Sequence, residues 1–214
     1  MRFSGYFFDL DGTLIDSSKD IAQATNYTLK QLGFPPLPEE EIIKHVGYGG
    51  KKLLEGVLGK DNQYLIEKAV SIFRDYYFNN PVVYTKPYPE TLEVLENLKK
   101  HDKKIAVITN KYESVSKEIL KKLNMLDYID LIIGGDTLNE KKPSPKPVLY
   151  ALENFGISCD DAIMIGDSET DVLSGKKANT KTCLVMFGYG KKELAKSYNP
   201  DYIIPKLSDV LKIS

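Results

Sequence analysis

Two aspartates, Asp9 and Asp11, stand one residue apart directly after an apolar run that begins at residue 5. Two carboxylates so close together repel each other unless a cation or a shared proton relieves the repulsion. Asp11 is followed by glycine, which also suits a simple turn. The segment "DLDGT" starts like a calcium-binding loop, but Thr13 and Leu14 occupy the places where that loop needs Asp or Asn and then Gly. The spacing therefore predicts a cation beside the two aspartates, but not a calcium loop.

Polar residues of matching chemistry follow three further apolar runs. Thr109 and Asn110 end "AVITN", Lys142 lies in "GGDTLNEKKPSP", and Asp167 and Asp171 lie in "IMIGDSETD". The aspartates offer hard oxygen ligands, which suit Mg²⁺ with several waters retained. Thr109, the backbone amide of Asn110 and Lys142 offer donors for anionic oxygens. A carboxylate nucleophile, a metal and a phosphate clamp together indicate phosphoryl transfer.

Each residue has an expected role in that chemistry. Asp9 is the predicted nucleophile, and Mg²⁺ and Lys142 neutralise the approach of an anionic substrate. Asp11 would protonate the leaving oxygen and then take a proton from water. Plainer interpretations exist, because Asp167 and Asp171 also suit caps of the helix predicted near residue 170. Lys142 also suits a solvated lysine.

Short apolar runs predict the sheet that would position these residues. Each run is apolar on successive residues, which is typical of strands covered on both faces of a parallel sheet. Helical patterns separate the runs, and this alternation predicts a doubly wound, Rossmann-like α/β core with ligands beyond the carboxyl ends of its strands. The predicted strands are Gly5–Leu10, Ile105–Thr109, Leu131–Gly134, Ala162–Gly166, Thr182–Phe187 and an edge strand at Tyr202–Pro205. The predicted helices of this core are Glu90–Lys100, Glu113–Asn124, Lys146–Phe155, Thr170–Lys177 and a short one at Leu207–Ile213.

About ninety residues separate the first two predicted strands, although a simple crossover with its helix needs only about a dozen. Most of this stretch has helical patterns, at Asp20–Leu32, Glu39–His45, Lys51–Leu58 and Asn62–Asn79. We therefore predict a helical insertion at residues 16–80 and a catalytic core made of residues 1–15 and 81–214. The aromatic run at residues 76–78 should pack inside the insertion.

Composition limits the function classes. The 214 residues carry a net charge of −1, so no global field recruits nucleic acid or an anionic membrane. Two cysteines are too few for a disulfide framework, and no apolar stretch approaches the roughly 20 residues needed to span a bilayer. The N-terminal residues also lack the apolar core of a signal peptide. We expect a cytoplasmic monomer or homodimer without nucleic-acid or membrane partners.

The segments "DLDGTLID", "VITNK", "KKPSP" and "IGDSETD" resemble the four ordered motifs of the haloacid dehalogenase-like phosphatases. The resemblance covers nearly the whole chain and identifies the helical insertion with the C1-type cap. It implies that Asp9 is phosphorylated and that Asp11 is the general acid and base. It also implies that Thr109 and Lys142 bind phosphate. Mg²⁺ would be held by Asp9, the backbone carbonyl of Asp11, Asp167 in direct contact, and Asp171.

Within that family, "VGYGGKKLLEGVLG" and "LIIGGDTLNEKKPSPKPVLYALENFGI" look most like phosphoglycolate phosphatases. The expected substrate is therefore a small phosphorylated metabolite, 2-phosphoglycolate. Its carboxylate tail would meet the backbone amides of Gly49 and Gly50, at the start of a predicted helix, because helix N-termini favour anions. Lys51, the next residue of this helix, is also expected to bind the substrate. The alternatives are a pyrophosphatase, a sugar phosphomutase, or a regulator that binds Mg²⁺ and phosphate without turnover. Arg2 and Arg74 are the only arginines, which disfavours the cationic cap of a mutase.

Overall fold

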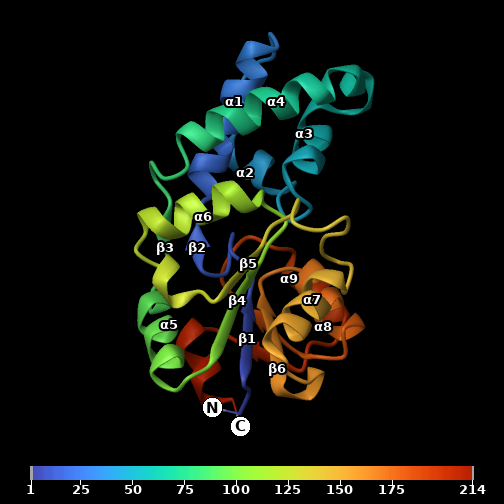
Figure 1. Ribbon diagram of the computed structural model, residues 1–214. Helices are drawn as coiled ribbons and strands as arrows, with labels where there is room; N and C mark the ends of the chain where they lie inside the picture. Colours follow the sequence, from blue (N-terminus) through green and yellow to red (C-terminus); the bar gives the residue numbers. More distant parts are fainter. Residues whose placement is uncertain (1, 214) are drawn as a thin grey trace.

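Six short apolar runs form one parallel sheet in the computed structural model, which describes residues 2–213 (Figure 1). The strands are, in spatial order, β5 (Leu131–Ile133), β4 (Lys104–Ile108), β1 (Gly5–Phe8), β6 (Ala162–Gly166), β7 (Lys181–Val185) and β8 (Tyr202–Ile204). All five neighbouring pairs are parallel, and Phe7 of β1 lies opposite Ala106 of β4 and Met164 of β6. The predicted α/β class and the predicted edge strand at residues 202–205 are confirmed.

Both faces of the sheet are covered, which is why its strands are apolar on successive residues. Side chains alternate between the faces of a strand, and Tyr6 and Phe8 pack in one buried cluster while Phe7 packs in another. The first face is covered by α5 (Thr91–Lys100), α6 (Glu113–Lys122) and the 3₁₀ helix η4 (Leu207–Lys212). The second face is covered by α7 (Lys146–Phe155), α8 (Glu169–Lys177) and α9 (Lys192–Ser197). Figure 1 shows α5 on one side of the strands and α7 and α8 on the other.

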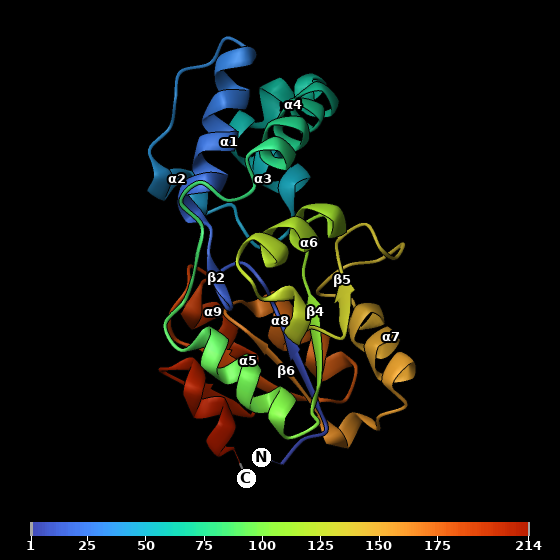
Figure 2. The same cartoon turned by 60° about the vertical axis from the view of Figure 1, so that its left-hand side comes forward.

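The predicted helical insertion lies between β1 and β4. It consists of α1 (Ser18–Gln31), α2 (Glu39–Ile43), α3 (Gly50–Leu58), the 3₁₀ helix η1 (Lys60–Leu65) and α4 (Ile66–Asn79). Helix α1 packs against α4 (Figure 2). The rings of Tyr27 and Tyr76 are stacked between them, with centroids 4.3 Å apart. The helix predicted from residue 62 becomes regular only at Ile66, because Asn62 has non-helical backbone angles. The division into a core at 1–15 and 81–214 and a cap at 16–80 remains a prediction, and residues 1 and 214 lie outside the described chain.

Two short antiparallel strands close the crossing between the sheet and the insertion. They are β2 (Ile15–Asp16) and β3 (Lys86–Pro87). Beside them the buried carboxylate of Asp20, on α1, accepts hydrogen bonds from the backbone amides of residues 83–85 and from the hydroxyl of Thr85. The pattern of the sequence indicated a return crossing here but no strand pair.

Some short elements differ from the prediction. The last predicted helix is the 3₁₀ helix η4, and α9 was not predicted. The remaining 3₁₀ turns are η2 (Leu126–Tyr128) and η3 (Cys159–Asp161).

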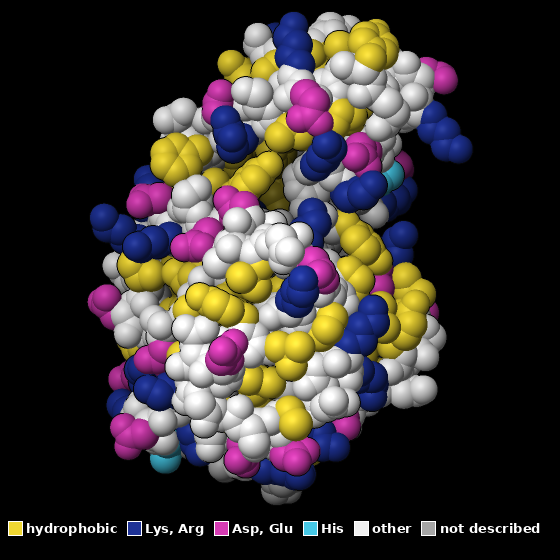
Figure 3. All heavy atoms as spheres, turned by 45° about the vertical axis from the view of Figure 1, so that its right-hand side comes forward, with side chains coloured by type: hydrophobic (Ala, Val, Ile, Leu, Met, Phe, Trp, Pro, Cys, Tyr) yellow, Lys and Arg dark blue, Asp and Glu magenta, His cyan; other side chains and the backbone are white. Residues whose placement is uncertain are grey.

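Positive and negative side chains are interspersed over the face shown in Figure 3, in line with the nearly neutral composition. Among residues 2–213, no helix combines the length and the hydrophobicity needed to cross a membrane. The expectation of a cytoplasmic monomer or homodimer remains a prediction.

Candidate functional site

The carboxyl ends of three adjacent strands bring most of the predicted residues to one edge of the sheet. Asp9 and Asp11 follow β1, Thr109 follows β4, and Asp167 follows β6. Strands β4 and β6 flank β1, and the backbone amide of Asp9 donates to the carbonyl of residue 165 at 2.9 Å. Parallel pairing therefore places side chains together that are more than a hundred and fifty positions apart in the sequence.

Lys142 is the cationic centre of this group. It comes from the loop between β5 and α7, its side chain is only 1% exposed, and its ammonium lies 2.8 Å from Asp9 Oδ1 and 2.6 Å from Asp171 Oδ1. Burial would lower the pKa of this ammonium, but the charges of Asp171 and Asp9 outweigh burial and raise the pKa above its ordinary value. Lys142 is thus a buried, charged group that faces the predicted nucleophile.

Asp167 and Asp171 have local partners as well as a place in the cluster. One oxygen of Asp171 accepts hydrogen bonds from the backbone amide and hydroxyl of Ser168 at the start of α8, while the other oxygen faces Lys142. Asp167 Oδ2 accepts backbone hydrogen bonds from Tyr189 and Gly190. The capping interpretation of Asp171 and its place at the site are therefore compatible.

The three acids Asp9, Asp167 and Asp171 form a set that fits a divalent cation. Each offers an oxygen within 4.8 Å of the others, and all three residues are buried. Burial raises the pKa of Asp167 to about 6 and raises the pKa of Asp9 against the opposing charge of Lys142. Three clustered carboxylates, all hard oxygen donors, match what Mg²⁺ requires.

Thr109 and Asn110 lie at the end of β4, as predicted, and Asn110 has a further connection. Its side-chain amide donates to the carbonyl of Gly47 in the helical insertion at 2.8 Å and to the carbonyl of Lys142 at 2.9 Å. The side-chain amide of Asn110 therefore links the helical insertion to the loop that carries Lys142.

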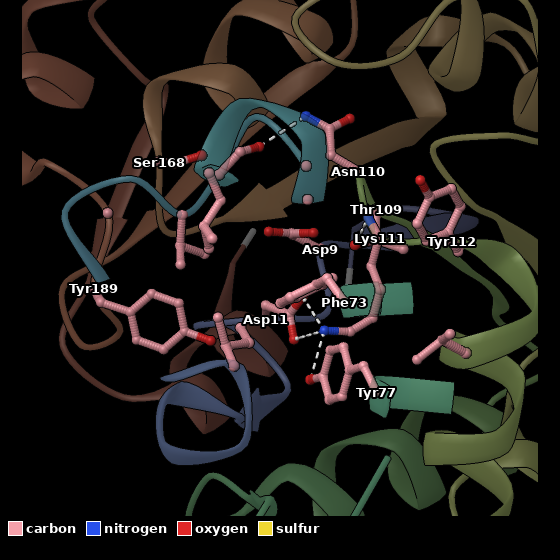
Figure 4. Close-up of a pocket in the computed structure, with 18 of the residues that line it drawn as sticks. Asp9, Asp11, Phe73, Tyr77, Thr109, Asn110, Lys111, Tyr112, Ser168 and Tyr189 are labelled. Atoms are coloured by element: carbon pink, nitrogen blue, oxygen red, sulfur yellow. Dashed lines mark hydrogen bonds and ion pairs between the residues drawn. The ribbon is translucent and has the colours of Figure 1, made fainter. Parts of the chain in front are cut away.

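Lys111 belongs to the site although the sequence did not single it out. Its ammonium lies 2.9 Å from Asp11 Oδ1, 2.8 Å from Asp11 Oδ2 and 2.9 Å from the hydroxyl of Tyr77 on α4 (Figure 4). Asp11 also accepts from the hydroxyl of Ser17 at 2.5 Å. Lys111 directly follows the end of a strand and two predicted site residues. This position in the sequence could have indicated that it belongs to the site. Tyr77 reaches the core rather than packing only inside the insertion.

Lys51 is not brought to this group. Its side chain is 52% exposed, and its ammonium lies 2.6 Å from Glu67 on the surface of the insertion. Gly49 and Gly50, predicted with it, do line the pocket. Gly49 has a positive φ of 88°, and a Cβ there would come within 2.9 Å of the Asn110 carbonyl oxygen, so glycine permits the close approach of the two loops.

The pocket lies between the strand ends and the helical insertion. It encloses about 60 Å³, which is room for only a few water molecules. The acids line it on the side of the sheet, and apolar side chains of the insertion and of α6 line the opposite side, including Leu53, Phe73 and Val115. With a cation bound among the acids, such a cavity would suit a small ligand with one strongly anionic end.

Comparison with known proteins identifies relatives of this chain. The family model described as "Haloacid dehalogenase-like hydrolase" matches residues 6–185. The chain is 50% identical to a phosphoglycolate phosphatase of Aquifex aeolicus, covering 96% of this chain and 94% of that protein. It is 43% identical to a phosphoglycolate phosphatase of Neisseria meningitidis, covering 95% of this chain and 90% of that one.

Solved structures show the same fold. A crystal structure described as "a predicted phosphoglycolate phosphatase" from Haemophilus somnus superposes with a TM-score of 0.92 at 28% identity, over 99% of this chain and 98% of that one. A haloacid dehalogenase-like hydrolase from Streptococcus pneumoniae gives a TM-score of 0.88 at 30% identity, over 99% and 98% of the two chains. This chain belongs to the haloacid dehalogenase-like hydrolases.

Proposed function

We propose that this chain is a Mg²⁺-dependent phosphatase that hydrolyses 2-phosphoglycolate to glycolate and phosphate. The observation that carries the proposal is the pairing of buried Lys142 with Asp9 at a strand end, within a cluster of three acids. The names of the relatives at 50% and 43% identity support the choice of substrate.

Asp9, Asp167 and Asp171, with the backbone carbonyl of Asp11, would hold the metal. When bound, Mg²⁺ supplies the positive charge that lets an anionic nucleophile approach an anionic phosphate. The ammonium of Lys142, which contacts Asp9 and Asp171, would add to this charge, and Thr109 and the backbone amide of Asn110 would donate hydrogen bonds to the phosphate oxygens.

The reaction proceeds in two transfers. An oxygen of Asp9 attacks phosphorus, the bond from phosphorus to the ester oxygen breaks, and Asp11 gives its proton to that leaving oxygen. Water then attacks the phosphorus of the aspartyl phosphate, Asp11 takes the proton from this water, and the bond to Asp9 breaks. Phosphate leaves, and both aspartates return to their starting states.

The helical insertion would act as a cap. It closes the pocket above the strand ends, and its loop at Gly47 is held to the core by Asn110. Closure excludes water during the first transfer, and opening releases the products. The small cavity favours a compact substrate over the sugar phosphate of a mutase.

A panel of substrates tests the proposal. We expect kcat/KM for 2-phosphoglycolate to exceed the values for pyrophosphate, glucose 1-phosphate and glycerol phosphate. The proposal fails if another substrate is preferred by about tenfold or more, which equals about 1.4 kcal/mol of transition-state binding. Asp9→Asn should abolish turnover without unfolding the protein, and trapping with fluoroberyllate should place the adduct on Asp9.

A further inference from the structure

The pocket has one buried cation that the phosphatase mechanism does not use. Among the described residues that line it, Lys111 and Arg74 carry positive charge. The side chain of Arg74 is 55% exposed and lies 3.6 Å from the carboxylate of Asp75. The side chain of Lys111 is only 7% exposed. Lys111 is therefore the lining cation with the least access to water.

Contacts from two directions fix the Lys111 ammonium. From the sheet, Asp11 accepts from it, and from α4 the hydroxyl of Tyr77 lies 2.9 Å away with the ring centroid at 4.4 Å. Tyr77 is itself buried. The ammonium thus lies where the helical insertion meets the ends of the strands, and the close-up shows it between these two residues (Figure 4).

The wall beyond this ammonium is apolar. Leu53 on α3, Phe73 on α4 and Val115 on α6 line the same pocket. A carboxylate placed against such side chains without a counter-charge is strongly disfavoured. A ligand whose phosphate lies at Asp9 and whose tail points toward the insertion therefore needs a cation at the position that Lys111 occupies.

We propose that Lys111 is a specificity-determining residue that binds a second anionic group, a carboxylate, on the tail of the phosphate ester. The ammonium has three donors, and the incoming carboxylate shares them with Asp11 and Tyr77. The amides of Gly49 and Gly50, on the same pocket, approach the tail from the insertion. This inference rests on the proposed phosphatase activity and names the residue that selects its substrate.

If Lys111 only held Asp11 in place, its substitution would lower kcat/KM equally for all substrates. The test therefore compares kcat/KM for a substrate with a carboxylate and for one without it. The probes are 2-phosphoglycolate and ethyl phosphate, which has a methyl group in place of the carboxylate. We expect Lys111→Met to lower the ratio of their kcat/KM values about a hundredfold, as expected for truncating one partner of a buried charge pair. Lys121→Met, which removes an exposed lysine of α6, is the matched control and should leave the ratio unchanged.

Equal losses for both esters in Lys111→Met would overturn the inference and leave the proposed function standing. If wild-type protein instead prefers 3-phosphoglycerate, and Lys111→Met removes that preference, the carboxylate site stands and the proposed substrate falls. Should Lys111→Met fail to fold, Lys111→Gln takes its place, because it keeps a hydrogen-bond donor of similar length but removes the charge. A ratio lowered about tenfold or more in Lys111→Gln supports the role of Lys111, and an unchanged ratio refutes it.

Discussion

The ammonium of Lys142 lies 2.8 Å from Oδ1 of Asp9, with side chains that are 1% and 12% exposed. The same ammonium contacts Asp171, so one cation balances two buried carboxylates. Its role in the reaction and its role in stability therefore cannot be separated by position alone, and substitution should affect both.

Lys142→Met should abolish most turnover and lower the free energy of unfolding by about 3–5 kcal/mol, because it leaves buried carboxylates without their partner. Urea unfolding of the metal-free protein measures the second effect. Lys146→Met is the control, since its ion pair with Glu140 is exposed to water and should contribute little to stability. Wild-type stability in Lys142→Met would contradict the assignment.

Asp11→Asn should slow turnover about 10²- to 10⁴-fold, which is the usual contribution of general acid and base catalysis. Substrates with good leaving groups need less protonation, so their first transfer should suffer less. Single-turnover measurements with aryl and alkyl phosphates separate this step. Equal losses for good and poor leaving groups would mean that Asp11 has no acid role in the first transfer.

Mg²⁺ should raise the melting temperature of the metal-free protein, because a ligand that binds only the folded state stabilises it, by about 2.7 kcal/mol at a hundredfold excess over Kd. Asp167→Asn and Asp171→Asn should each reduce this shift. Asp61→Asn, an exposed aspartate of η1, should keep it. Calorimetric scans with and without Mg²⁺ provide the comparison, and an unchanged shift in both site variants would remove these acids from the metal site.

Asp20→Ala should lower the free energy of unfolding by about 3 kcal/mol or more, because three backbone amides and one hydroxyl lose a buried acceptor. Hydrogen exchange at residues 83–85 should accelerate as well. Asp75→Ala, on the exposed surface of α4, is the control and should change stability little. Unchanged exchange at residues 83–85 would show that Asp20 does not hold the crossing.

The lowered pKa of Asp201 should make the stability of the folded protein depend on pH. Burial would raise its pKa, but hydrogen bonds from Thr182 and Lys181 outweigh burial and lower the pKa. A group whose pKa is lower in the folded than in the unfolded state stabilises the folded state at any pH above its unfolded pKa, which is about 3.9 for aspartate. This stabilisation is lost as the pH falls through the pKa of the folded state. Asp201→Asn should therefore be less stable than wild type at pH 7, and the difference should shrink as the pH falls through the folded pKa of Asp201. Asp160→Asn, which changes an exposed aspartate, is the control for the substitution itself and should differ little in stability from wild type at pH 7.

The sheet and the acid cluster were predictable because one rule governs both. Parallel strands end at a common edge, so polar residues after separate apolar runs must meet there. Asp9 and Asp167 follow from this rule with no knowledge of the intervening chain. The prediction of Lys142 also required the motif around it, because Lys142 lies in a loop and not at the end of a strand.

The contacts between the insertion and the core were not predictable in this way. Tyr77 lies within an aromatic run whose pattern indicates packing, and only the docking of α4 brings its hydroxyl to Lys111. Lys51 follows Gly50 by one residue, but successive helical side chains point about 100° apart, so the glycine lines the pocket while the lysine faces Glu67. The strands β2 and β3 are two residues each, too short for any periodicity to show.

The position of β1 between β4 and β6 has a consequence for the order of folding. Strand β1, which carries Phe7 and Phe8, precedes both of its partners in the chain, since they lie at residues 104–107 and 162–165. The entire helical insertion is synthesised before either partner exists. Strand β1 is therefore apolar and unpaired until β4 and β6 have been synthesised. The centre of the sheet then forms through contacts of long sequence separation, which are slow to form. Asp9, at the end of β1, therefore meets Asp167, at the end of β6, only after this late pairing has formed.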